Sequence, residues 1–143
     1  VCYRDSQDSS KQKANVLTVD PSNNTISTGT AVVIANAQAG ADCELVYDPS
    51  SEKIVLALKD QSNTNNGTAY VGSVTGTGMS WGGRNIFETS SEANFISMTY
   101  DESIKRIVIC YNLQTDSSPT ALTAQALVNA VLCIEIVTQP MIL

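Results

Sequence analysis

Short apolar runs, each closed by Gly, Pro, Asn, Asp or Ser, follow one another along the whole chain. Runs this short between turn residues are typical of β-strands rather than helices. The pattern predicts an all-β protein with strands over residues 1–5, 14–20, 25–36, 42–47, 53–60, 68–74, 79–88, 94–100, 105–112, 121–128 and 131–138. Only residues 120–130, rich in Ala, also suit a helix. We favour a strand there because that segment takes the place of residues 68–74 in the repeat described next.

The chain nearly repeats itself every 53 residues. Residues 53–58 (KIVLAL) return as residues 106–111 (RIVICY), and the pair Tyr47-Asp48 returns as Tyr100-Asp101. A period near fifty, made of short strands, is typical of β-repeat architectures in which sheets or blades stack on one another. The sequence therefore predicts antiparallel four-stranded meander repeats in a propeller-like arrangement.

Counted on this period, the chain is a single β-repeat domain that contains parts of three repeats. Residues 42–93 form a complete repeat, residues 1–41 a partial one and residues 94–143 a divergent terminal one. The chain has no initiator Met and opens inside the motif, since residues 1–5 match 56–60, so we expect a processed or truncated product. A propeller ring typically needs four to eight blades, and about 2.5 are present. We therefore expect neighbouring subunits to complete the structure.

The central strand of each repeat, residues 54–58 and 107–111, is apolar at every position. A strand exposed on one face alternates apolar with polar residues. The continuous runs predict that both faces of each central strand are covered by neighbouring sheets. Residues 68–74 alternate and are more typical of an outer strand.

The composition is that of a folded but weakly charged protein. Hydrophobic residues make up 43% of the 143 residues, which excludes wholesale disorder, whereas charged residues make up only 15%. Ser, Thr, Asn, Gln and Gly take their place. This balance suits an extracellular, cell-surface or virion protein better than a cytosolic enzyme.

The net charge of −6 argues against anionic partners. Nucleic acids and anionic membrane surfaces both require a basic face, and the eight basic residues are scattered. No apolar run reaches the roughly 18 residues that span a bilayer. We expect neither nucleic-acid binding nor membrane insertion.

The chain lacks the usual residues for catalysis. It contains no His, which excludes Ser-His-Asp and Cys-His arrangements and makes the common zinc sites improbable. Acidic residues recur at turns, where we interpret them as caps of backbone amides rather than catalytic carboxylates; they are Asp5, Asp48, Asp60 and Asp101.

The polar loop 60–67 lacks the ligand spacing of a calcium loop. Trp81 is interpreted as a packing residue rather than a sugar-stacking one. We expect a protein without enzymatic activity or cofactor.

Two kinds of covalent modification are indicated. The four cysteines, Cys2, Cys43, Cys110 and Cys133, allow two disulfides in three connectivities. The repeat favours Cys2–Cys43, which leaves Cys110–Cys133; the alternative is that all four are buried thiols. Sequons with an Asn in a predicted turn make Asn23 and Asn66 candidates for N-glycosylation.

The middle repeat reads Y-D-x-x-x-x-K-I-V-x-A-x-K-D, then a polar turn, then N-G-T-A-x-V-G-x-V-x-G-x-x-x-x-x-G. This pattern resembles β-propeller-like repeats in fibre and surface proteins of phages and bacteria. The residues that carry the resemblance are Tyr47, Asp48, Lys53, Ile54, Val55, Ala57, Lys59, Asp60, Asn66, Gly67, Thr68, Ala69, Val71, Gly72, Val74, Gly76 and Gly82. It covers the middle repeat, part of the first, and the third through Asn112. It implies a structural, adhesive or glycan-facing role.

Together these features predict an extracellular or virion structural protein that assembles with itself into a fibre or filament. An apolar C-terminal strand would complete a sheet in the neighbouring copy, and its contact residues would be Val131, Leu132, Ile134, Ile136 and Val137. One alternative is that this strand closes its own domain. The other is a glycan-binding adhesin or lectin module.

Overall fold

The computed structural model describes residues 1–115, 119–126 and 132–135, with side chains except those of residues 35–37, 39, 41, 42 and 132–135. These residues form thirteen β-strands and one short 3-10 turn, η1, and no α-helix is among them. The elements are β1 (Cys2–Asp5), β2 (Lys11–Ala14), β3 (Leu17–Asp20), β4 (Thr25–Thr28), β5 (Val32–Asp48), β6 (Lys53–Asp60), η1 (Gln61–Asn63), β7 (Asn66–Thr75), β8 (Gly78–Trp81), β9 (Asn85–Glu88), β10 (Ala93–Asp101), β11 (Arg106–Leu113), β12 (Pro119–Ala126) and β13 (Leu132–Glu135). The all-β prediction is confirmed.

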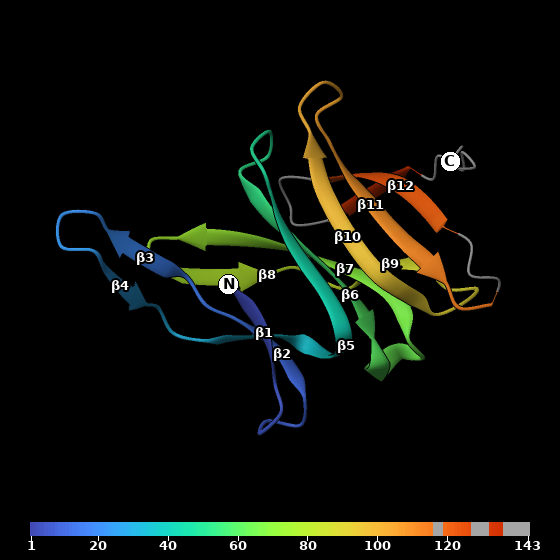
Figure 1. The fold of residues 1–143 in the computed structure, drawn as a ribbon, viewed down its shortest axis with the longest axis horizontal. Helices are drawn as coiled ribbons and strands as arrows, with labels where there is room; N and C mark the ends of the chain where they lie inside the picture. The colour runs from blue at the N-terminus through green and yellow to red at the C-terminus, as the bar shows by residue number, and fades with distance from the viewer. Residues whose placement is uncertain (116–118, 127–131, 136–143) are drawn as a thin grey trace.

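All the strand pairs are antiparallel and fall into three sheets (Figure 1). The largest sheet has the order β1-β2-β5-β6-β7-β8, with β9 also paired to β7. The second has the order β10-β11-β12-β13, and β3 and β4 form a separate hairpin. None of the sheets closes into a barrel.

The sequence repeat reappears as a repeat of strand pairings. Asp48 pairs with Lys53 between β5 and β6, and Asp101 pairs with Arg106 between β10 and β11. The next ladders, β6–β7 and β11–β12, follow in the same order. The second and third repeats therefore share a β-meander, as the sequence predicted.

The first repeat follows the same pattern from β1 onwards. Ala14 of β2 pairs with Val32, as Ala69 of β7 pairs with Asn85. This correspondence matches β2 to β7 and β1 to β6. Strand β6 lies between β5 and β7, whereas β1 has only β2 as a neighbour among the described strands. Strand β1 is therefore an edge strand at a position that is internal in the second repeat.

Strand β6 lies at the centre of the packing. Val55 and Ala57 point into a cluster shared with β10, β11 and β12, which we call the C-terminal core. Leu56 and Leu58 point the other way, into a cluster with Ala14, Ile34 and Tyr70, which we call the N-terminal core. All four β6 side chains are fully buried. The predicted covering of both faces is confirmed for this strand.

The same prediction is wrong for residues 107–111. Ile107, Ile109 and Tyr111 are buried against the second repeat, but Val108 and Cys110 between them remain partly exposed. The physical reason is the position of β11 in the last repeat. Among the described residues, no further sheet lies against its outer face.

Several strand boundaries also differ from the sequence prediction. The expected strand 14–20 is divided, because the backbone amide of Gly29 donates to Val16 O (2.8 Å) and the side chain of Asn15 donates to Gly29 O (3.0 Å). These bonds separate the β3–β4 hairpin from the sheet. The expected strands 25–36 and 79–88 are divided as well, and residues 32–48 form one strand. Strand β2 begins at Lys11, three residues before the expected strand 14–20. The preference for a strand over a helix within 120–130 is confirmed as far as Ala126.

Part of the predicted C-terminal strand pairs within its own chain, and its contact with a second copy stays a prediction. Residues 132–135 pair with β12 of the same chain, so Leu132 and Ile134 belong to a strand that extends its own sheet. The other predicted contact residues, Val131, Ile136 and Val137, lie outside the described residues. The outer edge of β13 has no neighbour in the described part of the chain.

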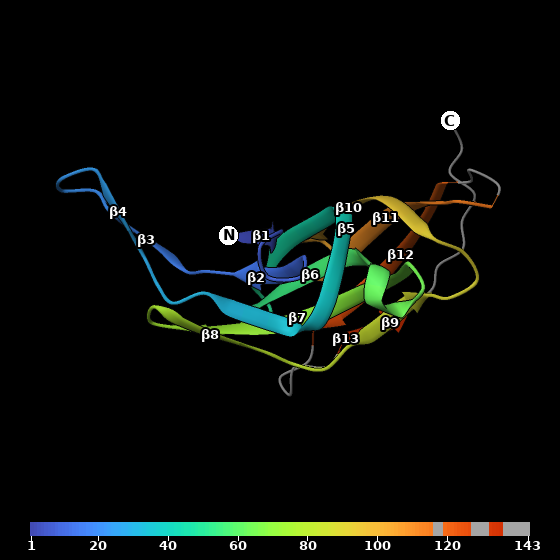
Figure 2. The ribbon, with the colours of Figure 1, turned by 90° about the horizontal axis from the view of Figure 1, so that it is seen from below.

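The β3–β4 hairpin extends away from the body of the molecule (Figure 2), and all of its strand residues are exposed. Val19 pairs with Ile26, and Leu17 pairs with Thr28 on the same face. An isolated two-stranded hairpin is at best marginally stable in water. This hairpin therefore presents an uncovered apolar face.

Replacement of Leu56 by Ala tests the double-sided packing of β6. Removing a fully buried Leu side chain leaves a cavity in the N-terminal core, so the free energy of unfolding should fall by about 2–5 kcal/mol. Urea denaturation measures the change. Ile104→Ala, in an exposed turn, is the control and should alter stability by less than about 0.5 kcal/mol. Equal effects of the two changes would contradict the assignment of β6 to the core.

Candidate functional site

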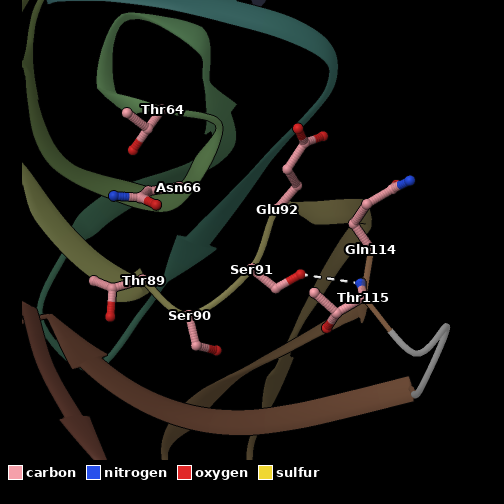
Figure 3. A pocket seen from close by; sticks show the side chains of 8 residues that line it. All are labelled: Thr64, Asn66, Thr89, Ser90, Ser91, Glu92, Gln114 and Thr115. Carbon is pink, nitrogen blue, oxygen red and sulfur yellow. Dashed lines mark hydrogen bonds between the residues drawn. The ribbon is translucent and has the colours of Figure 1, made fainter.

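A polar hollow of about 360 Å³ lies where loops of the second and third repeats meet (Figure 3). One wall comes from the η1–β7 connection, another from the β9–β10 connection, and a third from the end of β11. The lining residues are Thr64, Asn66, Thr89, Ser90, Ser91, Glu92, Gln114 and Thr115. All are hydroxyl, amide or carboxyl residues.

The β9–β10 connection is shaped by a carboxylate cap. Glu88 Oε1 accepts hydrogen bonds from the backbone amide and the hydroxyl of Ser90, both at 2.6 Å. Glu88 Oε2 accepts a third from the phenol of Tyr111, at 3.1 Å, which ties this connection to the third repeat. Burial opposes ionisation of Glu88, but these bonds outweigh it and hold the pKa below its ordinary value of 4.5. Burial and the charge of Glu88 raise the pKa of Tyr111.

The carboxylate of Glu92 is held by residues of the second repeat. Asn65 donates to Oε1 at 2.8 Å, and Lys59 Nζ lies 3.6 Å from Oε2. Lys59 also donates to Asn94 Oδ1 at 2.7 Å, and Asn94 donates to Gln114 Oε1 at 2.6 Å. A continuous polar network therefore joins β6, β10 and the end of β11 at one side of the hollow.

An ion pair between the exposed Arg84 and the buried carboxylate of Asp60 supports the η1 wall. Arg84 Nη2 lies 3.0 Å from Asp60 Oδ2, and the Asp60 side chain is fully buried. Asp60 also accepts the backbone amide of Ser62 at 3.0 Å, and Arg84 Nε donates to the phenol of Tyr70 at 3.3 Å. The loop 60–67, in which the sequence showed no calcium-loop spacing, is thus organised by Arg84, which precedes β9 and also contacts Ser62.

The hollow is suited to a ligand with many hydroxyl groups. Its side chains offer hydrogen-bond donors and acceptors, and no aromatic ring, Cys or His is among the lining residues. Within the described part of the chain, no three His, Cys, Asp or Glu residues gather as a metal site would require. No helix of the described residues is long and apolar enough to cross a membrane.

The two candidate glycosylation residues lie in different surroundings. Asn23 is exposed in the turn of the β3–β4 hairpin, where its Oδ1 accepts the backbone amide of Thr25 at 3.0 Å. Asn66 is half-buried at the start of β7 and lines the hollow, and Thr68 of its sequon is fully buried. Exposure therefore favours Asn23 as the acceptor.

The structure brings one of the two predicted cysteine pairs together and keeps the other apart. Cys2 and Cys43 are free thiols in the structure, in hydrogen-bonding contact with each other, so the repeat predicted their proximity and the disulfide stays a prediction. Cys110, however, pairs with Ala121, whereas Cys133 pairs with Gln125 four residues farther along β12. Four residues of strand span about 13 Å. A disulfide requires Cα atoms within about 7 Å. The register does not bring Cys110 and Cys133 together.

The interpretation of the recurrent aspartates as turn caps is confirmed. Asp48 Oδ1 accepts the backbone amide of Ser50 at 2.9 Å, and Asp101 Oδ1 accepts that of Ser103 at 2.8 Å. Trp81 is half-buried against the N-terminal core, which supports its interpretation as a packing residue. Asp48, Asp101 and Trp81 do not line the hollow.

Sequence reasoning did not identify the hollow. Its main segment, residues 89–92 (TSSE), has the composition of an ordinary turn in this chain. The meander places it beside Gln114 and Thr115, and that proximity depends on how two repeats pack.

No protein-family model, curated protein or solved structure matches the chain. Evidence for the function therefore comes from the geometry of the molecule itself. Two features bear on it: the hollow, and the uncovered strand edges and apolar faces.

Replacement of Glu88 by Gln should reduce the loss of stability in acid. Because the pKa of Glu88 is lower in the folded chain, its contribution is complete above the ordinary value of 4.5 and is lost as the pH falls through the folded value. Urea denaturation at pH 7 and pH 3 should show a smaller difference for the variant. Solvent screening limits the change to less than about 1 kcal/mol. Glu102→Gln, at an exposed turn, is the control; an equal change there would contradict a special role for Glu88.

Proposed function

We propose that this chain is an extracellular or virion structural protein whose copies assemble by β-sheet completion, in an open, propeller-like stack without catalytic activity. The observation that carries the proposal is the open edge of β1. The same position in the second repeat, β6, has strands on both sides. A strand supplied by another copy would restore the pairing that the repeat otherwise has.

Backbone groups at this edge point in the direction that strand addition requires. Val1 and Asn15 exchange two hydrogen bonds, each of 2.9 Å. In an antiparallel ladder such pairs alternate with pairs whose N–H and C=O groups point away from each other. Cys2 and Arg4 therefore direct their backbone groups away from β2, towards the open edge. Val1 and Tyr3 add partly exposed apolar side chains beside it.

The donor in this proposal is the C-terminal strand region, β13 and the residues that follow it, of a second copy. Strand β13 also has an unpaired edge among the described strands, and it lies in the third repeat, whereas β1 lies in the first. Donor and acceptor thus differ, so each added copy would leave one edge of each kind open. A head-to-tail contact of this type that does not close into a ring produces a filament.

The β3–β4 hairpin adds a second reason to favour association. Leu17, Val19 and Ile26 are 43%, 63% and 63% exposed. In the second repeat, the corresponding residues 72–75 and 78–81 remain in the sheet, where Met79 and Trp81 pack against the N-terminal core. The detached hairpin therefore exposes apolar surface that association with another copy would cover.

Replacement of Arg4 by Pro tests assembly through the β1 edge. Proline removes the outward N–H of residue 4 and is tolerated on a free strand edge, so the variant should fold but assemble at least about tenfold more slowly. Light scattering and electron microscopy of the purified chain provide the measurement. Arg4→Ala, which keeps the N–H and also loses the contact with Ser10, is the matched control and should assemble like the wild type.

Two results would contradict the proposal. One is a wild-type chain that stays monomeric at every concentration. The other is assembly of the Arg4→Pro variant at the wild-type rate, which would place the contact elsewhere.

Glycan binding is the second candidate function, and the hydroxyl- and amide-lined hollow supports it. It ranks below assembly because no aromatic ring among the lining residues could stack on a sugar. Phe95, which is 79% exposed, is not among them.

A double variant, Thr89→Val with Thr115→Val, tests this second function. If the hollow binds a glycan, loss of two hydroxyl groups should weaken binding roughly tenfold without unfolding the chain. A glycan array followed by calorimetry measures this, with Thr28→Val on the hairpin as the control. Absence of binding to any glycan, or equal binding by the double variant, would contradict a sugar site in the hollow.

A further inference from the structure

Two cysteines that are 41 positions apart in the sequence meet beside the N-terminal core. Cys2 lies on the edge strand β1, and Cys43 lies on the long strand β5. Both side chains are half-buried against the N-terminal core as free thiols, and the two thiols are in hydrogen-bonding contact. The buried amide of Gln12 also donates to Cys43 Sγ, at 3.5 Å.

The registers of the two strands explain this meeting. Cys2 is paired with Ala14, which is fully buried, so the Cys2 side chain points into the molecule while its backbone groups face the open edge. Cys43 is paired with Leu58, which is also fully buried, so its side chain points into the same layer. The contact therefore results from the way the first repeat covers the second.

We propose that Cys2 and Cys43 form a disulfide that fixes the edge strand β1 to the body of the molecule. The consequence for assembly rests on the proposed function, whereas formation of the bond does not. The oxidant is a small disulfide of the glutathione class. One cysteine thiolate attacks it and releases one reduced thiol, and the second thiolate attacks the mixed disulfide and releases another. Two protons leave, two electrons pass to the oxidant, and one S–S bond forms.

Strand β1 is the element that gains most from such a bond. It has four residues and pairs only with β2 among the described strands. Short edge strands with a single neighbour open readily. A disulfide between Cys2 and Cys43 closes the loop between these residues, which lowers the conformational entropy of the unfolded chain and keeps β1 in its place in the folded one. The outward N–H and C=O groups of Cys2 and Arg4 are then held ready for an incoming strand.

The remaining cysteines provide an internal comparison. Cys110 is half-buried on the outer face of β11, and the strand register separates it from Cys133. Neither lies on β1 or β5. The strand register therefore supports a bond between Cys2 and Cys43 and does not support one between Cys110 and Cys133.

Peptide mapping of the full chain tests bond formation. After incubation with oxidised glutathione, alkylation and trypsin digestion without reductant, peptides 1–4 and 14–53 should be recovered joined, with the loss of two hydrogen atoms. The Cys2→Ser and Cys43→Ser variants should each lack this product. Alkylation of both cysteines after oxidation, or linkage of either to Cys110 or Cys133, would overturn the proposal.

Stability and assembly test the consequence of the bond. Reductant should lower the thermal midpoint of the oxidised wild type by roughly 10 °C and leave Cys2→Ser unchanged. Reduction should also slow wild-type assembly at least about tenfold. A bond that forms without any effect on stability or assembly would overturn the role given to it here. A chain that forms the bond and gains stability but never assembles would overturn the proposed function and leave the disulfide standing.

Discussion

The packing of β6 determines the rest of this structure. A strand with apolar side chains on both faces requires a layer on each side, and the first and third repeats supply these layers. Each covering repeat uses one face in this way and leaves its other face towards solvent in the described chain. A stack of similar repeats therefore moves its uncovered surface to its two ends. The number of repeats, rather than the fold of any one of them, decides how much apolar surface remains exposed.

The sequence predicted the features that depend on local pattern and on the repeat. The 53-residue period became matching strand pairs, and the continuous apolar run at residues 54–58 identified the strand that is covered twice. The aspartates at recurrent turns were correctly interpreted because an Asx cap involves only the next few residues. The proximity of Cys2 and Cys43 followed from the repeat alone.

Features that depend on long-range contacts were missed. The break of the predicted strand 14–20 arises from hydrogen bonds of Asn15 and Val16 to Gly29, which no periodicity reveals. The run at residues 107–111 has the same pattern as its counterpart in β6, but no further sheet of the described residues covers its outer face, and the run itself does not encode what covers it. The hollow was missed for a related reason, since its polar residues become a site only where two repeats pack together. In a repeat protein, equivalent sequences can thus occupy unequal surroundings.

The junctions between the repeats are built differently. The first and second repeats share β5, a single strand of 17 residues that pairs with β2 in its first half and with β6 in its second. The second and third repeats are joined by residues 89–92, outside any strand, together with side-chain packing. Force applied along the chain would act on the first junction in shear, across many backbone hydrogen bonds at once. The second junction would resist through side-chain packing in the C-terminal core and through side-chain hydrogen bonds such as Lys59–Asn94 and Tyr111–Glu88, so the two junctions resist force by different kinds of interaction.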